Sequence, residues 1–144
     1  MRVTHIYAAS EDTQVLELPL LSFGVQAGFP SPAQDYVQSM LDLNAYVVKN
    51  REATFFLRVE GDSMQDARVF NNDIVVVDKS LTPLNGSLVI ASLEGDLVLR
   101  KFCKVGKRVF LVWNDVELEI TSTPLETVEI WGTVTFVIHD MRQP

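Results

Sequence analysis

The sequence has a single cysteine, Cys103, and only two histidines. One cysteine cannot form an internal disulfide, which argues against a disulfide-stabilised secreted domain and favours a reducing compartment. On an apolar strand, a lone cysteine is more often a small core residue than a redox thiol. The cysteine content therefore predicts a cytoplasmic protein.

Long hydrophobic runs are also absent. The longest ones, such as residues 74–77, are far too short to span a bilayer. Residues 1–10 do not show the basic stretch and apolar segment of a signal peptide. We expect neither export nor membrane insertion.

Positive charge is scarce, with a formal net charge of −7. Such a balance argues against direct, specific binding of DNA, because phosphate contacts need lysine and arginine. One exception is residues 100–108, which hold five of the twelve basic residues. This stretch is either a solvated hairpin, which we favour, or a nucleic-acid patch. An acidic protein that acts in DNA processes would do so through protein partners.

The length of 144 residues suits one domain with a short appendage, and 47% hydrophobic residues are enough for one core. Residues 1–27 lack sustained periodicity and are interpreted as an extended arm. Ser31, Pro32 and Gln34 are typical of a helix start. The apolar residues that follow are spaced so that they would lie on one face of a helix, and a helix of about ten residues is therefore predicted there.

From residue 54 onward the pattern is typical of strands, with short runs of β-branched and aromatic residues separated by turns. Strands are predicted over residues 54–59, 73–78, 87–93, 97–102, 109–113 and 128–138. Gly132 is the expected bulge in the last of them. The fold class is therefore mostly β, a barrel or sandwich with one short helix.

Ser63 is the candidate nucleophile. Gly61 allows a sharp turn after the preceding strand, and a serine on such a turn can present its hydroxyl beside backbone N–H groups. A plain polar turn between two strands has the same appearance, so Gly61-Asp62-Ser63-Met64 is a weak signal by itself.

A serine hydroxyl needs a base to become a good nucleophile. His5 and His139 lie at opposite ends of the chain without an evident carboxylate partner, so a Ser-His-Asp triad is not expected and both are interpreted as surface residues. A serine-lysine dyad is the alternative, and it needs a lysine kept neutral by burial. The apolar strand at residues 97–102 carries such a lysine, Lys101.

Together these motifs resemble the LexA/UmuD family of self-cleaving serine peptidases (peptidase S24). The likeness runs from about residue 15 to residue 142, and its motifs are Phe29-Pro30-Ser31-Pro32-Ala33, Gly61-Asp62-Ser63-Met64, Asp73 with its apolar run, and Gly95-Asp96-Leu97-Val98-Leu99-Arg100-Lys101. The resemblance implies a LexA/signal-peptidase-like β fold in which Ser63 and a strand lysine cut the protein's own arm.

By the same resemblance, the cut falls between Ala27 and Gly28. Residues 1–27 would be the cleavable arm and residues 28–144 the peptidase-like β domain. Only 27 residues precede Gly28, too few for a DNA-binding helical domain with its own core, and this favours the UmuD branch. Ala27-Gly28 could also be a plain flexible joint.

Arg100 departs from the family pattern, because it falls at the position of the catalytic lysine and Lys101 follows one place later. A guanidinium is not a base near pH 7, and neighbouring residues on a strand point to opposite faces. Three readings follow: a bulge turns Lys101 toward Ser63, Arg100 leaves a slow or dead enzyme, or the chain is a binding module.

The resemblance also implies partners: a RecA filament on single-stranded DNA that promotes cleavage, a Y-family polymerase subunit, and a second copy in a homodimer. Cleavage would take place within one chain or within the dimer. Residues 128–138, interpreted as an edge strand, are a place where two copies could pair. Residues 16–21 resemble a sliding-clamp contact, although an apolar arm that packs on its own protein is the simpler reading. No cofactor and no metal site is expected.

Overall fold

The structure is a computed structural model that describes residues 1–9, 15–21, 37–121 and 128–143. It divides into two compact units, which are described separately. One unit joins Met1–Ala9 to Asn50–Pro144, and the other is Ser10–Lys49. The first residues of the chain thus belong to the larger unit rather than to an extended arm.

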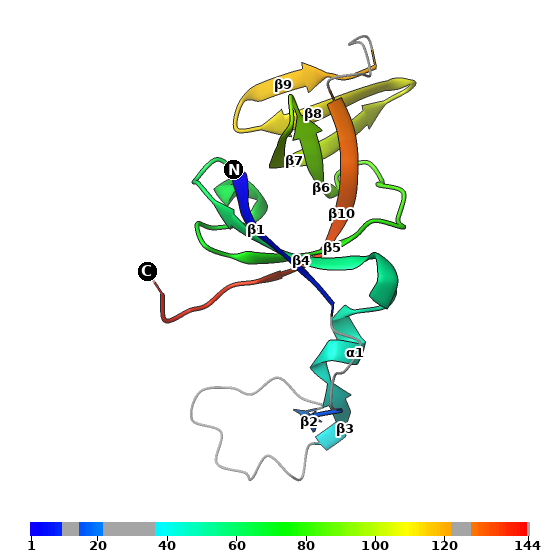
Figure 1. Ribbon diagram of the computed structural model, residues 1–144, viewed down its shortest axis with the longest axis vertical. Helices are drawn as coiled ribbons and strands as arrows, with labels where there is room; N and C mark the ends of the chain where they lie inside the picture. The colour runs from blue at the N-terminus through cyan, green and yellow to red at the C-terminus, as the bar shows by residue number, and fades with distance from the viewer. Residues whose placement is uncertain (10–14, 22–36, 122–127, 144) are drawn as a thin grey trace. The chain divides into compact units, whose positions relative to one another are not determined.

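The larger unit is an eight-stranded antiparallel sheet (Figure 1). Its strands are β1 (Arg2–Ala8), β4 (Thr54–Glu60), β5 (Ile74–Asp78), β6 (Leu88–Leu93), β7 (Asp96–Val105), β8 (Arg108–Trp113), β9 (Val116–Glu119) and β10 (Val128–Ile138). They lie in the order β1-β4-β5-β10-β6-β7-β8-β9, and Arg2 of β1 also pairs with Val98 of β7. This last pairing links the first strand to β7, so the sheet curls into a barrel with extra strands. The mostly β fold class is confirmed.

The six strands predicted from residue 54 onward are all present, with ends shifted by a few residues. The register shift between Ile130 and Gly132 confirms the predicted bulge. A Cβ at Gly132 would lie 2.5 Å from Cγ1 of Val77, so only glycine fits where β10 crosses β5.

Strand β10 lies between β5 and β6 in the sheet. The prediction that residues 128–138 form an edge strand is therefore wrong. The first half of β10 pairs with β6 and the second half with β5, because the bulge bends β10 from one neighbour to the other.

The core of this unit consists of two apolar clusters. The first is centred on Leu57, Val59 and Leu99, and it includes the first residue, Met1, which is 9% exposed. The second cluster contains Phe102 of β7 and Leu111 of β8. Two short 3₁₀-helices, Arg51–Ala53 and Gln65–Ala67, flank β4.

The smaller unit contains a two-stranded antiparallel sheet, β2 (Glu17–Leu21) with β3 (Val37–Asp42), and the helix α1 (Leu43–Val47). The helix predicted from Ser31 is wrong over its second half, because residues 37–42 are a strand. Pairing with β2 outweighs the helix-like spacing of the apolar residues in this segment. The helix α1 begins only after Asp42, whose carboxylate accepts a hydrogen bond from the Asn44 N–H. Ser31, Pro32 and Gln34 lie outside the described residues.

Within the described part of the chain, no helix is both long and apolar enough to cross a membrane.

Candidate active site

Ser63 follows directly on the turn that ends β4. Gly61 adopts φ +124°, a conformation that side-chain-bearing residues rarely take, and its N–H donates to Oδ1 of Asn71 at 2.9 Å. A Cβ at Gly61 would lie 3.3 Å from Cα of Met1. Glycine is thus needed both for the turn and for the close approach of the chain's first residue.

The residue after Ser63 anchors the turn to the core. The Met64 side chain is 3% exposed and packs in the first apolar cluster. Its carbonyl accepts from the N–H groups of Ala67 at 3.0 Å and Val69 at 3.2 Å. Because Met64 is fixed in this way, the half-buried Ser63 hydroxyl is held in one place.

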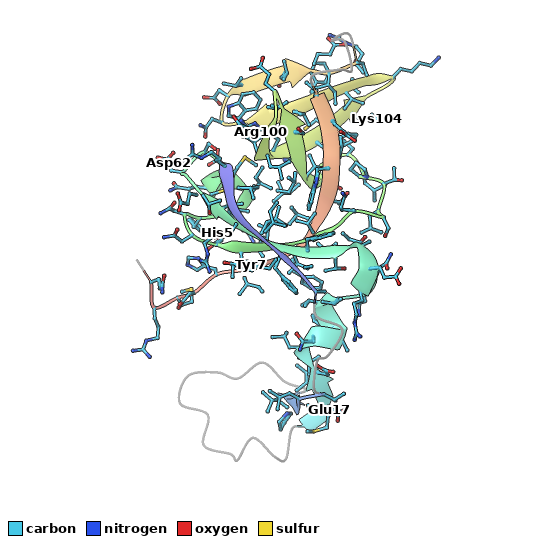
Figure 2. All side chains as sticks on the ribbon, viewed as in Figure 1. His5, Tyr7, Glu17, Asp62, Arg100 and Lys104 are labelled. Carbon is cyan, nitrogen blue, oxygen red and sulfur yellow. The ribbon has the colours of Figure 1, made fainter. Side chains whose placement is uncertain are left out.

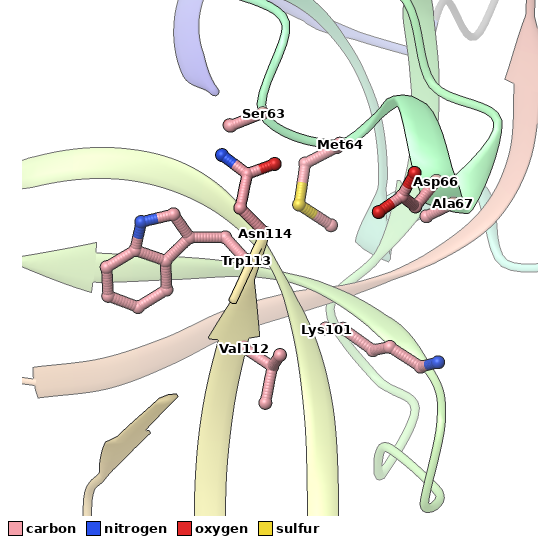
Figure 3. A pocket seen from close by; sticks show the side chains of 8 residues that line it. All are labelled: Ser63, Met64, Asp66, Ala67, Lys101, Val112, Trp113 and Asn114. Carbon is pink, nitrogen blue, oxygen red and sulfur yellow. The ribbon is translucent and has the colours of Figure 1, made fainter. Parts of the chain in front are cut away.

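Ser63 borders a cavity of about 200 Å³ between this turn and the β7–β8 region (Figure 3). The other lining residues are Met64, Asp66, Ala67, Lys101, Val112, Trp113 and Asn114. A cavity beside a fixed hydroxyl is the kind of place where a peptide group could be bound and attacked.

The α-amine of Met1 donates a hydrogen bond to Oγ of Ser63 at 2.6 Å. Burial lowers the pKa of this amine below its ordinary value, and the positive charge of Arg100 lowers it further, whereas the Asp62 carboxylate raises it. An amine with a lowered pKa is more often neutral near pH 7 and can then accept a proton.

Arg100 is buried on β7, with 9% of its surface exposed. Its Cζ lies 4.0 Å from the centroid of the Trp113 ring, and Nη1 donates to the carbonyl of Leu99 at 2.9 Å. Nε is buried without a hydrogen-bond partner, and burial lowers the pKa of the guanidinium. Figure 2 places Arg100 in the region where β1 begins. The favoured reading of residues 100–108 as a solvated hairpin is therefore wrong at Arg100.

Lys101 is exposed and lines the same cavity as Ser63. Figure 3 shows its side chain extending away from Ser63. The pairing of β6 with β7 runs without a register shift from Leu88 opposite Lys101 to Leu93 opposite Asp96. No bulge therefore turns Lys101 toward the hydroxyl, and alternation places Arg100 and Lys101 on opposite faces.

His139 contacts the buried Asp73 carboxylate through Nδ1. His139 is exposed, as predicted, but the prediction that it has no carboxylate partner is wrong. The two residues are far apart in sequence and meet only through the sheet. This pair lines a different cavity from that of Ser63, so it does not complete a triad there. His5 contacts only Thr4 and the ring of Tyr7 among the described interactions.

The remaining basic residues of the 100–108 stretch, Lys104, Lys107 and Arg108, are exposed, as a solvated hairpin requires. Cys103 is half-buried. Within the described ranges, no three or more His, Cys, Asp or Glu side chains gather as metal ligands would. Ala27 and Gly28, the predicted cleavage site, lie outside the described residues.

Met1 is the site residue that sequence reasoning missed. The signal was present: Arg2–Ala8 is rich in β-branched and aromatic residues and could have been predicted as a strand. Nothing in the local pattern indicates that this strand would bring its first residue to Ser63.

Comparison with known proteins identifies the family. Residues 19–135 match the Peptidase S24-like family. Protein MucA of Salmonella typhimurium is 37% identical over 90% of this chain and 90% of its own length. Protein ImpA of Escherichia coli is 41% identical over 87% of this chain and 86% of its own. The LexA repressor of Shewanella piezotolerans is 36% identical over 94% of this chain and 66% of its own. With a fold of the expected type and a serine at the turn after β4, the chain belongs to the peptidase S24 (LexA/UmuD) family, and its similarity to MucA and ImpA places it among the UmuD-like members.

Proposed function

We propose that this protein is a UmuD-like switch: Ser63 cuts the chain between Ala27 and Gly28, and the product of residues 28–144 serves an error-prone DNA polymerase in the response to DNA damage. The observation that carries the proposal is the fixed hydroxyl of Ser63, which borders a cavity and has an amine nitrogen within 2.6 Å. Family membership supplies the reaction class. In this proposal the protein acts in the cytoplasm.

The partners in this proposal are those of the family. A RecA filament on single-stranded DNA favours the pose of the arm in which cleavage occurs, through its higher affinity for that pose. The product forms a homodimer and joins a Y-family polymerase subunit.

The sliding clamp is a further proposed partner of the segment around β2. Leu16, Leu18 and Leu20 are 64%, 59% and 40% exposed. Exposed apolar residues that follow one another at every second position provide one face for a partner.

The test is incubation of the purified protein with RecA, single-stranded DNA and a nucleotide triphosphate, followed by mass measurement. The expected product begins at Gly28 and does not form with Ser63→Ala. A second experiment omits RecA and uses a higher pH, at which the neutral form of a base is more abundant. A chain that stays intact in both experiments would contradict self-cleavage.

The alternative is a binding module that regulates polymerase or RecA without cleavage. The buried Arg100 at the family's lysine position favours it, because a guanidinium does not accept the serine proton. Capture of the polymerase subunit by an uncleaved Ser63→Ala chain as well as by wild type would support this alternative.

A further inference from the structure

Met1 is held in place at four points. Its side chain is buried with Leu57, Val59 and Leu99. Its carbonyl accepts from Leu99 N–H at 2.9 Å, and its Cα faces Gly61 closely enough that a Cβ there would lie 3.3 Å away. The fourth contact is that of the α-amine with Ser63 Oγ.

The strand that follows keeps Met1 in this position. Arg2 pairs with Glu60 of β4 on one side and with Val98 of β7 on the other. The first residue therefore lies between the strand that ends at the Ser63 turn and the strand that carries Arg100. The amine meets the hydroxyl because the sheet places it there, not because a loose terminus rests on the surface.

Neither Arg100, at the family's lysine position, nor Lys101, one place later, can act as the family's lysine does. Arg100 carries a guanidinium that donates to a carbonyl. Lys101 lines the same cavity as Ser63, but its side chain extends away from Ser63 (Figure 3). Among the residues that the structure describes, the Met1 α-amine is the basic nitrogen recorded in a hydrogen bond with Ser63 Oγ.

We propose that, in the chain that starts at Met1, the α-amine of Met1 is the general base that activates Ser63, in place of a side-chain lysine. This inference rests on the proposed self-cleavage and names the base for it. An N-terminal amine is known as a base for a hydroxyl nucleophile in other hydrolases, so the chemistry is sound.

The proton and bond changes are as follows. The neutral α-amine takes the proton of Ser63 Oγ while Oγ bonds to the carbonyl carbon of Ala27. The resulting ammonium gives its proton to the Gly28 nitrogen as the peptide bond breaks, which leaves an ester between Ser63 and Ala27. The amine then takes a proton from water, whose oxygen attacks the ester. The ammonium returns this proton to Ser63 Oγ as the ester bond breaks, and the new carboxylic acid of Ala27 releases its remaining proton to solvent.

Two charged groups act on this amine in opposite senses. Arg100 on β7 lowers its pKa, and Asp62, in the turn between β4 and the 3₁₀-helix, raises it. Burial is the largest influence and also lowers it, so the neutral form becomes available below the ordinary α-amine range of about 7.7–8.0.

A one-cut switch follows from this arrangement. Met1 and Ala27 lie on the same side of the proposed cleavage site, so the base belongs to the fragment that is cut off. A product of residues 28–144 has Ser63 but not its base, and we expect it not to cleave a second chain in trans.

The test compares three forms of the chain under the cleavage conditions given above: one with a free Met1 amine, one with the same amine acetylated, and one with Gly-Ser added before Met1. Acetylation removes the basicity and the charge of the Met1 α-amine and adds only a small acetyl group. We expect cleavage to slow at least about 100-fold in both blocked forms, since general-base catalysis contributes roughly 10²–10⁴-fold. Equal rates in the free and blocked forms would overturn the inference and leave self-cleavage standing.

Arg100→Lys in the Gly-Ser chain is the control for folding and site integrity. We expect this variant to cleave again, because the lysine then provides the base from β7. If Arg100→Lys chains cleave and the wild-type chain with a free amine does not, the α-amine is not a competent base and the inference is overturned. If no chain cleaves, the proposed function itself fails, and the inference fails with it.

A second readout is independent of the arm and of RecA. A fluorophosphonate that modifies activated serines is added, and its attachment to Ser63 is measured by mass as a function of pH. Labelling should follow the titration of the α-amine and fall at least about 100-fold on acetylation. Labelling that acetylation does not change would contradict the assignment.

Discussion

The guanidinium of Arg100 lies over the indole ring of Trp113, with Cζ 4.0 Å from the ring centroid. Arg100 occupies the position on β7 at which the family carries its lysine, and Trp113 ends the neighbouring strand β8. A cation on an aromatic face compensates for part of the cost of its burial, here with one carbonyl partner and with Nε unpaired. This arrangement keeps a positive charge near the Met1 amine without offering Ser63 a base.

Arg100→Met should move the pH dependence of Ser63 labelling to higher pH. Arg100 lowers the pKa of the Met1 amine, so its removal raises that pKa and the neutral amine appears later as pH increases. The measurement is the fluorophosphonate labelling rate between pH 6 and 9. Stability should change little, because methionine fills similar space and leaves no buried unpaired nitrogen. A shift to lower pH would contradict the sign of this interaction.

Gly61→Ala should separate Met1 from Ser63. The new Cβ would lie 3.3 Å from Cα of Met1 at a backbone φ of +124°, so both contact and strain oppose it. We expect a loss of roughly 1–3 kcal/mol in the free energy of unfolding and slower Ser63 labelling. Gly95→Ala is the matched control, since φ is +89° there and no atom lies within 4 Å. Slower labelling in the control would show that strain alone causes the effect.

Gly132→Ala should destabilise the sheet where β10 bends. The added methyl group would lie 2.5 Å from Val77 Cγ1, and Val77 is fully buried. Overpacking of this kind costs roughly 1–3 kcal/mol, which urea unfolding can measure. Glu129→Ala, on the exposed side of the same strand, should stay within about 0.5 kcal/mol of wild type. A Gly132→Ala protein as stable as wild type would contradict the close packing of β10 on β5.

Asp73→Asn should weaken the connection between the end of β10 and the start of β5. The buried carboxylate accepts from Phe70 N–H at 2.8 Å and contacts His139. An amide keeps one oxygen for the Phe70 N–H but offers His139 an uncharged NH2 group in place of the second carboxylate oxygen. The charged contact is therefore lost, and hydrogen bonds to a charged group are worth about 1.5–3 kcal/mol. Unfolding by urea is the measurement, with the exposed Asp115→Asn as the control. Equal loss in both variants would mean that the His139 contact does not stabilise the fold.

Much of the fold can be predicted from the sequence because strand patterns are local. The β-branched runs from residue 54 onward, the glycine turns and the bulge at Gly132 depend on neighbours in the chain, and all of them are present. Strand β1 was missed because its seven residues stand alone before a segment without periodicity. The helix from Ser31 was predicted over residues that pair as β3, since a strand partner outweighs a local cap.

The sequence by itself determined the family, the mostly β class and the serine on the glycine turn, because motif and turn chemistry are written in consecutive residues. Only the tertiary structure decided what meets that serine. The Met1 amine and Ser63 are separated by 62 residues, and His139 and Asp73 by 66. Strand order and register determine which distant residues come into contact, and no local pattern encodes them. The same packing buried Arg100 and left Lys101 in solvent.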